Sequence, residues 1–475
     1  MNIVDANAAA NAPPELLDKI FKLCERRHRY IPADGHKLFP NSRFHPFLLV
    51  CKKWHAVAER RLYTSVGLGS SRVVRDRNGK KLELKSKDVC KRFCETVQND
   101  ARLASLVREL RMGCTSGEES EESAMHVRLI GICKNVEKIE IHGCHADRLG
   151  DLAAALAKAD LVSVDLSNEQ LGGYSVDGWM LTLSTVIRLI QRWPRLQRIY
   201  AHLARYESIT GYEAPLANLP SVPGISCPAL TKMAVYECTF DAAQLGQLVD
   251  LCPALEDLSI TVGRGCNEAL QQCLEVCSSS LRNLVVFAPT YGTPLPGDER
   301  SVIRCPMTEL REMWMSSPLV TPSDMVFLPK LEKLVFRGDY SQGADLVQVI
   351  RKGAMPNLRT IDANFSPPSK NDGSKEAARD DDLEIHLAEE LRRVCDERNT
   401  FFEDKFTELE ELEGYYGYPE EESPESSDNE WWQYENHDSA PADYDPALAS
   451  ALACCDSLAD YDYDSDDDPL ELILA

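Results

Sequence analysis

The chain has 475 residues, of which 44% are hydrophobic and 27% are charged, so it carries ample material for a buried core. No apolar run reaches the 18 residues of a membrane-spanning helix, and the opening MNIVDANAAANAPP lacks the basic and apolar regions of a secretory signal. We therefore expect a soluble protein of the cytoplasm and/or the nucleus, whose 17 cysteines are thiols and not a disulfide framework.

The negative charge is concentrated at the C-terminal end of the chain. Residues 401–475 hold 24 acidic residues against one base, Lys405, a balance of −23, whereas residues 1–400 hold 52 acids against 51 bases, a balance of −1. Binding of nucleic-acid phosphate or of anionic lipid requires clustered lysine and arginine. We therefore expect neither nucleic acid nor a membrane as a partner.

Residues 13–66, which follow an N-terminus (1–12) expected to be disordered, have the pattern of a small helical unit. Prolines at 13 and 14 favour a helix start, and an apolar stripe then consists of Leu16, Leu17, Ile20, Phe21 and Cys24. A second stripe follows Pro46 and consists of Phe47, Val50, Cys51, Trp54, Val57 and Ala58. Two such helices cannot form a large core, so we expect them to pack on the next domain or on a partner.

Within residues 67–106 we expect a linker and a capping helix at 86–100. Residues 107–364 then repeat the pattern L-x-x-L-x-L, which usually follows Cys-Pro, Leu-Pro, Met-Pro or Trp-Pro. The mean spacing is about 28 residues, near the range of leucine-rich repeats. Ten units carry this pattern: Val107/Leu110/Met112, Val136/Ile139/Ile141, Leu161/Val164/Leu166, Leu196/Ile199/Ala201, Leu230/Met233/Val235, Leu255/Leu258/Ile260, Leu281/Leu284/Val286, Leu310/Met313/Met315, Leu331/Leu334/Phe336 and Leu358/Ile361/Ala363.

Each unit predicts one short strand, because its last two apolar residues alternate with outward-facing ones. Segments of helical spacing lie between the strands, and long spacings at 170–178 and 203–226 indicate loop insertions. A single unit cannot bury both of its faces, so neighbouring units must stack. The sequence therefore predicts an α/β fold: a leucine-rich-repeat-like solenoid with a curved parallel sheet on its inner side.

Residues 365–404 read as a linker followed by an amphipathic helix, with Leu387, Leu391, Val394 and Cys395 on one face, which is placed to cap the solenoid. Residues 405–475 combine high negative charge with few aliphatic side chains, so they are expected to form a disordered acidic tail.

The N-terminal unit resembles the F-box, a helical motif that docks substrate receptors onto the Skp-type adaptor of cullin-RING ubiquitin ligases. The resemblance lies in PPELLDKIF and in FHPFLLVCKKWHAVAERRLYTSV, and the linking segment from Glu25 to Phe44 is longer and more polar than usual. An F-box before irregular leucine-rich repeats is similar to a substrate-receptor architecture common in fungi.

This resemblance implies a non-catalytic substrate-recognition subunit of an SCF-type ligase, bound to a Skp-type adaptor and a cullin scaffold, that presents an unknown target protein. The residues implied in adaptor binding are Pro14, Leu16, Leu17, Ile20, Phe21, Leu48, Val50, Cys51 and Trp54. The alternative is a leucine-rich-repeat scaffold or regulator without a link to a ubiquitin ligase.

No enzyme motif of the nucleophile-elbow, P-loop, dinucleotide-binding or zinc-protease type is present, so we expect no catalytic residues and no cofactor. The pairs Cys90/Cys94 and Cys273/Cys277 have helical spacing without a matching second pair, which favours core positions over zinc ligands. The cluster of His142, Cys144 and His145 is interpreted as loop residues, and no metal site is predicted.

The target is expected to bind the concave face of the sheet, where alternation places five aromatic or imidazole side chains outward. These are Tyr200, His202, Tyr236, Phe287 and Trp314. Aromatic residues on a solvent-facing sheet are typical of binding hot spots, and the alternative is that loop insertions cover them.

The acidic tail carries a regulatory hypothesis. Ser427 with Glu430 and Ser465 with Asp468 have the spacing that acidophilic kinases prefer, and Trp431, Trp432 and Tyr434 form an aromatic cluster. The tail could act only as a solubilising segment, bind a partner, or fold back onto the strand faces, whose basic residues are Lys138, Arg198, Lys232, Lys333 and Arg337.

Overall fold

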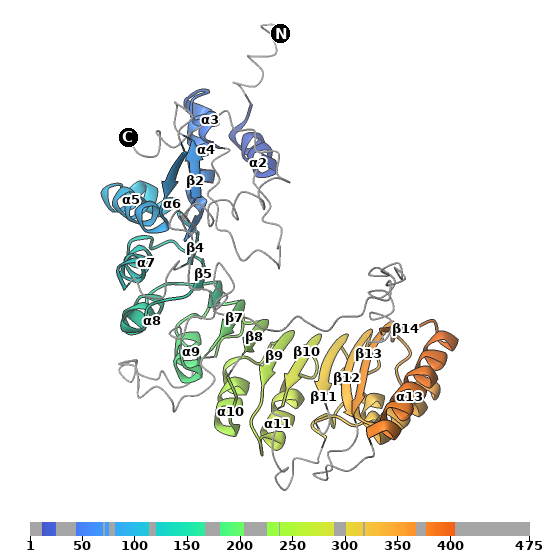
Figure 1. Cartoon of the computed structure of the whole chain (residues 1–475). Coiled ribbons are helices and arrows are strands. Elements are labelled where there is room, and N and C mark those ends of the chain that lie inside the picture. The colour runs from blue at the N-terminus through green and yellow to red at the C-terminus, as the bar shows by residue number, and fades with distance from the viewer. Residues whose placement is uncertain are drawn as a thin grey trace, which may run out of the picture.

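A computed structural model describes residues 12–24, 44–69, 72–75, 81–113, 120–166, 181–203, 226–236, 238–288, 301–316, 319–366 and 377–403. Within these ranges the chain forms a long curved solenoid with one continuous sheet along its inner side and helices along its outer side (Figure 1). The predicted N-terminal disorder and the acidic tail at 405–475 lie outside the described residues.

The sheet of the described part has twelve strands, all parallel to their neighbours, and their order in space equals their order in the chain. This order is the signature of a solenoid, in which each unit contacts only the next. The strands are β1 (Ser65–Leu68), β4 (Glu109–Gly113), β5 (Lys138–His142), β6 (Ser163–Leu166), β7 (Arg198–His202), β8 (Lys232–Tyr236), β9 (Asp257–Thr261), β10 (Asn283–Phe287), β11 (Glu312–Ser316), β12 (Lys333–Asp339), β13 (Thr360–Ser366) and β14 (Phe401–Glu403).

The ten strands predicted from the repeat are β4 to β13, so the α/β solenoid is confirmed. Two further strands extend it: β1 pairs with β4 ahead of the first predicted unit, and β14 pairs with β13 behind the last. Directly after β1 in the chain, β2 (Arg72–Arg75) and β3 (Lys81–Leu84) form a separate antiparallel pair.

Helices follow the strands and pack side by side on the outer face (Figure 1). They are α5 (Ser86–Asn99), α6 (Ala101–Leu106), α7 (Ser120–Ile132), η2 (Ala146–Arg148), α8 (Leu149–Leu156), α9 (Leu183–Ile190), α10 (Ala242–Leu251), α11 (Asn267–Cys277), η4 (Pro322–Phe327), α12 (Tyr340–Arg351) and α13 (Ala377–Glu397). The helix expected as a cap at 86–100 is α5, which contacts α7 and therefore belongs to the outer layer of the solenoid.

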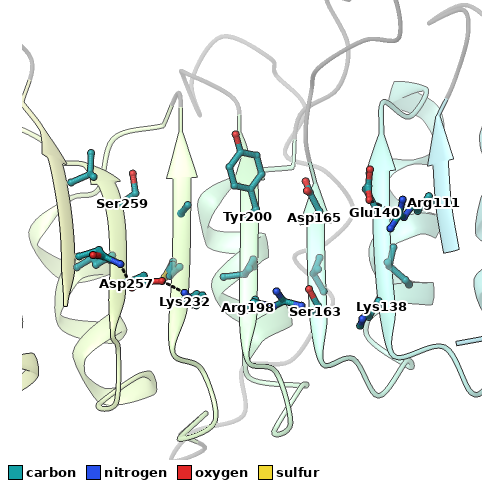
Figure 2. A pocket seen from close by; sticks show the side chains of 18 of the residues that line it. Arg111, Lys138, Glu140, Ser163, Asp165, Arg198, Tyr200, Lys232, Asp257 and Ser259 are labelled. Carbon is teal, nitrogen blue, oxygen red and sulfur yellow. Dashed lines mark hydrogen bonds and ion pairs between the residues drawn. The ribbon is translucent and has the colours of Figure 1, made fainter. Parts of the chain in front are cut away.

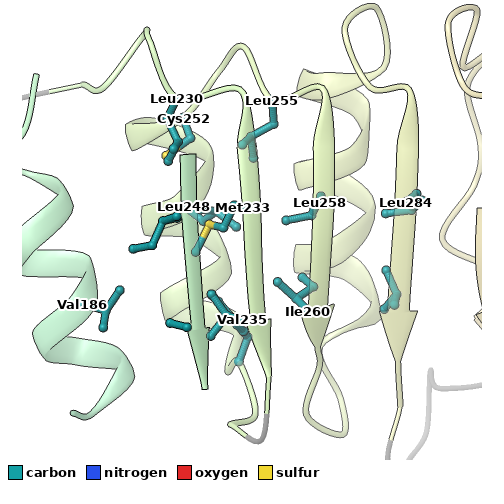
Figure 3. Close-up of a cluster of buried hydrophobic side chains, with 14 of the residues drawn as sticks. Val186, Leu230, Met233, Val235, Leu248, Cys252, Leu255, Leu258, Ile260 and Leu284 are labelled. Carbon is teal, nitrogen blue, oxygen red and sulfur yellow. The ribbon is translucent and has the colours of Figure 1, made fainter. Parts of the chain in front are cut away.

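The core lies between the sheet and the outer helices. The second and fourth residues of the strands point inward, as Leu258 and Ile260 do on β9, and meet helix residues such as Leu248 (Figure 3). The helical cysteines Cys273 and Cys277 are fully buried in this layer, as are Cys90 and Cys94, which confirms their interpretation as core residues.

The C-terminal helix α13 covers the last helix of the repeats, α12. Its predicted apolar face is buried and consists of Leu387, Leu391, Val394 and Cys395. Gly343 on α12 permits this close approach, because a Cβ atom there would lie 2.2 Å from a methyl carbon of Leu387. Within the described ranges, no helix has the length and apolarity needed to cross a membrane.

The N-terminal helical unit consists of α2 (Pro14–Cys24), α3 (His45–Leu48) and α4 (Lys52–Thr64). Helix α4 runs directly into β1, so the unit continues into the sheet without a linker. Where α4 meets the outer layer, the guanidinium of Arg102 on α6 donates to the carboxylate of Glu59 at 2.6 and 3.0 Å, and the rings of Tyr63 and Phe93 lie 6.2 Å apart.

A buried histidine should make the first repeats sensitive to acid. His126 on α7 is buried, and this burial lowers its pKa to about 4, from 6.5 in the unfolded chain. Since the unfolded state then binds the proton more tightly, stability is lost as pH falls below 6.5, by about 2 kcal/mol between pH 7.5 and pH 5. We expect His126→Leu to remove this part of the pH dependence, measured by hydrogen exchange of α7 at both pH values. An unchanged pH dependence in the variant would contradict the assignment.

Candidate protein-binding surfaces

The concave face of the sheet is built from the first, third and fifth residues of the strands. The second and fourth residues point into the core, so alternation places the others on the open side. Because the strands are in register, these residues form rows across the sheet. The middle row runs from Arg111 on β4 through Tyr200 on β7 to Trp314 on β11. Its charged part therefore lies at the N-terminal end of the sheet and its aromatic part over the centre.

Three of the predicted target-binding side chains form one cluster on β7 and β8. The ring centroids of Tyr200, His202 and Tyr236 lie 5.2 to 5.3 Å apart in all three pairs, and the Tyr200 hydroxyl is 3.2 Å from Nε2 of His202. All three side chains are half-buried. They pack on one another and keep part of each ring accessible on the concave side.

The other two predicted side chains, Phe287 on β10 and Trp314 on β11, form a second pair with ring centroids 5.1 Å apart. Trp314 is 40% exposed, so among the described residues no loop buries it. The sequence predicted one patch of five aromatic side chains. The structure instead divides them into two groups, because β9 lies between β8 and β10 and carries no aromatic residue on this face.

The strip of sheet between the two groups carries small side chains on its concave side, a feature that sequence reasoning missed. Ala234 on β8, Ser259 on β9 and Val285 on β10 lie at the same level, and Thr261 lies two residues beyond Ser259. The Ser259 side chain is only 8% exposed, and its hydroxyl has no hydrogen-bond partner among the described residues. Aligning the predicted strands in register would have revealed these small residues between Tyr200 and Trp314 of the same row.

A groove of about 530 Å³ runs along the N-terminal half of the concave face, from β4 to β10 (Figure 2). Its acids are largely engaged: Arg111 donates to Glu109 at 2.8 and 2.9 Å and lies 3.4 Å from Glu140. Lys138 and Arg198, by contrast, form no ion pair within the described residues and flank Ser163 in the first row. Lys232 is paired with Asp257.

The histidine and cysteine cluster near β5 is engaged in local contacts. Nε2 of His142 lies 2.7 Å from Glu140, the Cys144 thiol is buried, and His145 accepts a hydrogen bond from the backbone of Asp147 at the start of η2. Burial raises the pKa of the Cys144 thiol to about 11, which disfavours the thiolate. In the described part of the chain, no three metal-ligating side chains converge.

The helical unit has a small core of its own. Leu17 and Phe21 on α2 pack against Phe44, Val57 and Ala58. Phe21 stacks on Phe47 of α3 at 4.7 Å and meets the edge of Trp54 of α4 at 5.3 Å. Trp54 is therefore a core residue that is only half-buried.

This packing corrects the predicted adaptor-binding set. Leu17 and Phe21 were expected on the surface, but both are buried because α2 turns that stripe towards α3 and α4. Pro14, Leu16, Ile20 and Val50 are exposed, whereas Leu48, Cys51 and Trp54 are half-buried. Sequence reasoning missed Leu23 and Leu49, which are the most exposed apolar side chains of the unit at 81% and 68%. The spacing 16, 20, 23 would have placed Leu23 on the outer stripe.

An ion pair fixes the orientation of α2. The Arg61 guanidinium of α4 holds both carboxylate oxygens of Asp18, one of them at 2.7 Å, and this hydrogen bonding holds the pKa of Asp18 below its usual value. Bidentate contacts of this kind fix geometry as well as adding energy. Asp18 therefore keeps Leu17 inside and the Leu16/Ile20/Leu23 stripe outside.

No protein-family model matches the chain, and comparison with curated proteins finds no match. Among solved structures, the chain is similar to one in a crystal structure of the Rad7 and Elc1 complex in yeast, with 16% sequence identity and a TM-score of 0.28. The similarity covers 58% of this chain and 69% of that chain. At this level of identity and superposition, the similarity supports no argument about what this chain binds.

Proposed function

We propose that this chain is a non-catalytic substrate receptor of an SCF-type cullin-RING ubiquitin ligase, acting in the cytoplasm or the nucleus. In this proposal the helical unit binds a Skp-type adaptor, which connects the receptor to a cullin scaffold, and the concave face of the solenoid binds a target protein. The proposal combines the F-box resemblance of residues 13–66 with the position of that unit at the start of a repeat solenoid.

The observation that carries the proposal is the apolar outer surface of the helical unit. The side chains of Leu16 and Ile20 on α2 are 49% and 42% exposed to solvent. Leu23 extends the same exposed stripe of α2. Leu49 and Val50, directly after α3, are also exposed apolar residues. The stacking of Phe21 on Phe47 holds α3 against α2. Exposed apolar side chains gathered in this way mark a surface that another protein covers.

The continuity of α4 with β1 supports a receptor role. A substrate receptor must hold its target in a fixed position relative to the ligase, which requires a rigid connection between the two binding surfaces. Here the connection is a helix that enters the sheet directly and is paired to α6 through Glu59 and Arg102. The adaptor-facing surface and the concave face therefore belong to one body.

The test is binding of the whole chain to a purified Skp-type adaptor. We expect a stable one-to-one complex by gel filtration and calorimetry, and recruitment of the cullin scaffold through the adaptor. A well-folded chain that fails to bind the adaptor would overturn the proposal and would leave the alternative of a repeat scaffold without a ligase.

A further inference from the structure

The groove on the concave face contains two cations that the described chain does not neutralise. Lys138 on β5 and Arg198 on β7 both line it, and both side chains are exposed. Neither side chain forms an ion pair or a hydrogen bond with a described residue. The other two cations of the groove, Arg111 and Lys232, are paired with carboxylates. Two cations left unpaired in a concave surface attract an anionic ligand.

A hydroxyl group lies directly between these two cations. Ser163 on β6 is the register partner of Lys138 on one side and of Arg198 on the other, so the two cations start about 9.6 Å apart, at two strand spacings. Figure 2 shows the three residues side by side at one level of the sheet. The Ser163 side chain is half-buried, and within the described ranges its hydroxyl forms no hydrogen bond. An anionic group placed over Ser163 therefore meets three kinds of donor: an ammonium, a guanidinium and a hydroxyl.

The distribution of charge in the groove indicates a ligand group with a single negative charge. The groove is lined by four cations and four carboxylates, so its excess of positive charge is local, at Lys138 and Arg198. Asp165 lies two residues beyond Ser163 on the same side of β6, about 6.6 Å along the strand. The charges of Lys138, Arg198 and Asp165 sum to +1, which one carboxylate neutralises. A phosphate group brings about −1.5 to −2 at pH 7 and would leave an excess of negative charge beside Asp165.

The shape of the groove fits an extended polypeptide segment. The groove crosses the strands from β4 to β10, which are six strand spacings or about 29 Å apart. On β8 to β10 its third-row residues are the small Ala234, Ser259 and Val285, so the groove continues there without a bulky side chain across it. At about 3.3 Å per residue, an extended segment of about nine residues spans this length. A carboxylate bound at β6 would then fix the position of such a segment along the groove.

We propose that Lys138, Ser163 and Arg198 form a subsite for the carboxylate of an aspartate or glutamate side chain in an extended segment of the target. The two cations hold the carboxylate from either side, and the Ser163 hydroxyl donates to it from the sheet. This inference rests on the proposed function in one respect, that the concave face is the surface that binds the target. Its test measures the binding of peptides and not of an adaptor, so the two proposals fail separately.

The first experiment selects binders of the whole chain from random peptides of about twelve residues displayed on phage, long enough to span the groove. We expect the aligned binders to share Asp or Glu at one position. Selection on the whole chain carrying Lys138→Ala with Arg198→Ala should lose the enrichment of acidic residues at that position. A selection that yields no binders, binders without a shared acidic position, or the same acidic preference from the double variant would overturn the proposal.

The most enriched peptide is then synthesised in three forms, with glutamate, glutamine or phosphoserine at the shared position, and titrated by calorimetry. Glutamine should bind the unsubstituted chain about tenfold more weakly than glutamate, because hydrogen bonds to a charged group are the stronger ones. On the chain with Arg198→Ala this difference should fall below about twofold. Phosphoserine should bind no more tightly than glutamate. Equal binding of the glutamate and glutamine forms, or binding of the phosphoserine form alone, would contradict a carboxylate subsite.

A matched pair of lysines separates the subsite from net charge. Lys138→Ala should weaken binding of the glutamate peptide about tenfold. The control Lys333→Ala removes the same side chain from the same row of the sheet, where it is exposed and forms no ion pair with a described residue, but outside the groove. It should leave binding unchanged, and circular dichroism checks that both variants are folded. Equal effects of the two substitutions would show that only net charge matters and would overturn the subsite.

Discussion

The variant Leu16→Asp with Ile20→Asp is expected to lose binding to a Skp-type adaptor by more than a hundredfold while the chain stays folded. Burial of each of these side chains in an interface contributes about 1.5 to 3 kcal/mol, and every 1.4 kcal/mol is a factor of ten in affinity. Aspartate adds a charge that the interface would leave unpaired. Both side chains are already half-exposed in the free chain, so the fold loses little. Calorimetry with purified adaptor measures the effect.

Two controls separate a lost contact from a lost fold. Leu383→Asp with Ile385→Asp makes the same kind of change at exposed residues of α13, at the far end of the solenoid, and should leave adaptor binding unchanged. Leu17→Ala, on the inner side of α2, should destabilise the helical unit by about 2 to 5 kcal/mol and lower hydrogen-exchange protection in α2 and α4. If the Leu16/Ile20 variant binds the adaptor as the unsubstituted chain does, the assigned surface is wrong.

The variant Trp193→Ala should cause a large loss of stability, about 3 to 5 kcal/mol. Trp193 is fully buried between the units of β6 and β7, and its indole Nε1 donates to the carbonyl oxygen of Leu156 at 2.9 Å. Its own carbonyl accepts a hydrogen bond from the thiol of Cys227 at 3.2 Å, in the next unit. Since each unit is stabilised by its neighbours, the loss should spread to α8, α9 and α10, as hydrogen exchange would detect.

Two further tryptophan variants serve as references. Trp314→Ala removes the same side chain from the concave face, where it is 40% exposed, and should cost less than about 1 kcal/mol. Trp193→Phe keeps most of the volume but leaves the Leu156 carbonyl without its donor, at a cost of about 1 to 3 kcal/mol. Equal stability of Trp193→Ala and Trp314→Ala would contradict the continuous packing of the solenoid.

The ten strands β4 to β13 could be predicted from the sequence. In each repeat unit, the last two apolar residues point inward and alternate with outward-facing residues, which is the pattern of a strand with one buried face. The terminal strands do not follow from it. β14 has three residues, Phe401–Glu403, too few to show alternation, and β1 comes directly after a helix, with Tyr63 at the place of the leading aliphatic residue of the repeat. Each is a strand because the edge of an existing parallel sheet supplies its hydrogen bonds.

In the helical unit, the spacing of apolar residues did not predict which side of α2 is buried. Helix α2 carries two adjacent apolar stripes, one with Leu16, Ile20 and Leu23 and one with Leu17 and Phe21, and spacing alone does not distinguish the inner from the outer stripe. The rings of Phe44 and Phe47 and the Asp18–Arg61 ion pair make the choice. These partners lie more than 20 residues away in the chain, so only the tertiary structure identifies the surface available to an adaptor.

The sequence by itself determined the architecture and the outward face of Tyr200, His202, Tyr236, Phe287 and Trp314, because an alternation of period two fixes which side of a sheet a residue faces. It did not determine how those side chains are grouped. That depends on which residues the neighbouring strands place at the same level, and the small residues Ser259 and Thr261 of β9 separate Tyr236 from Phe287. The two aromatic groups are separate because strands from different repeat units align in this register.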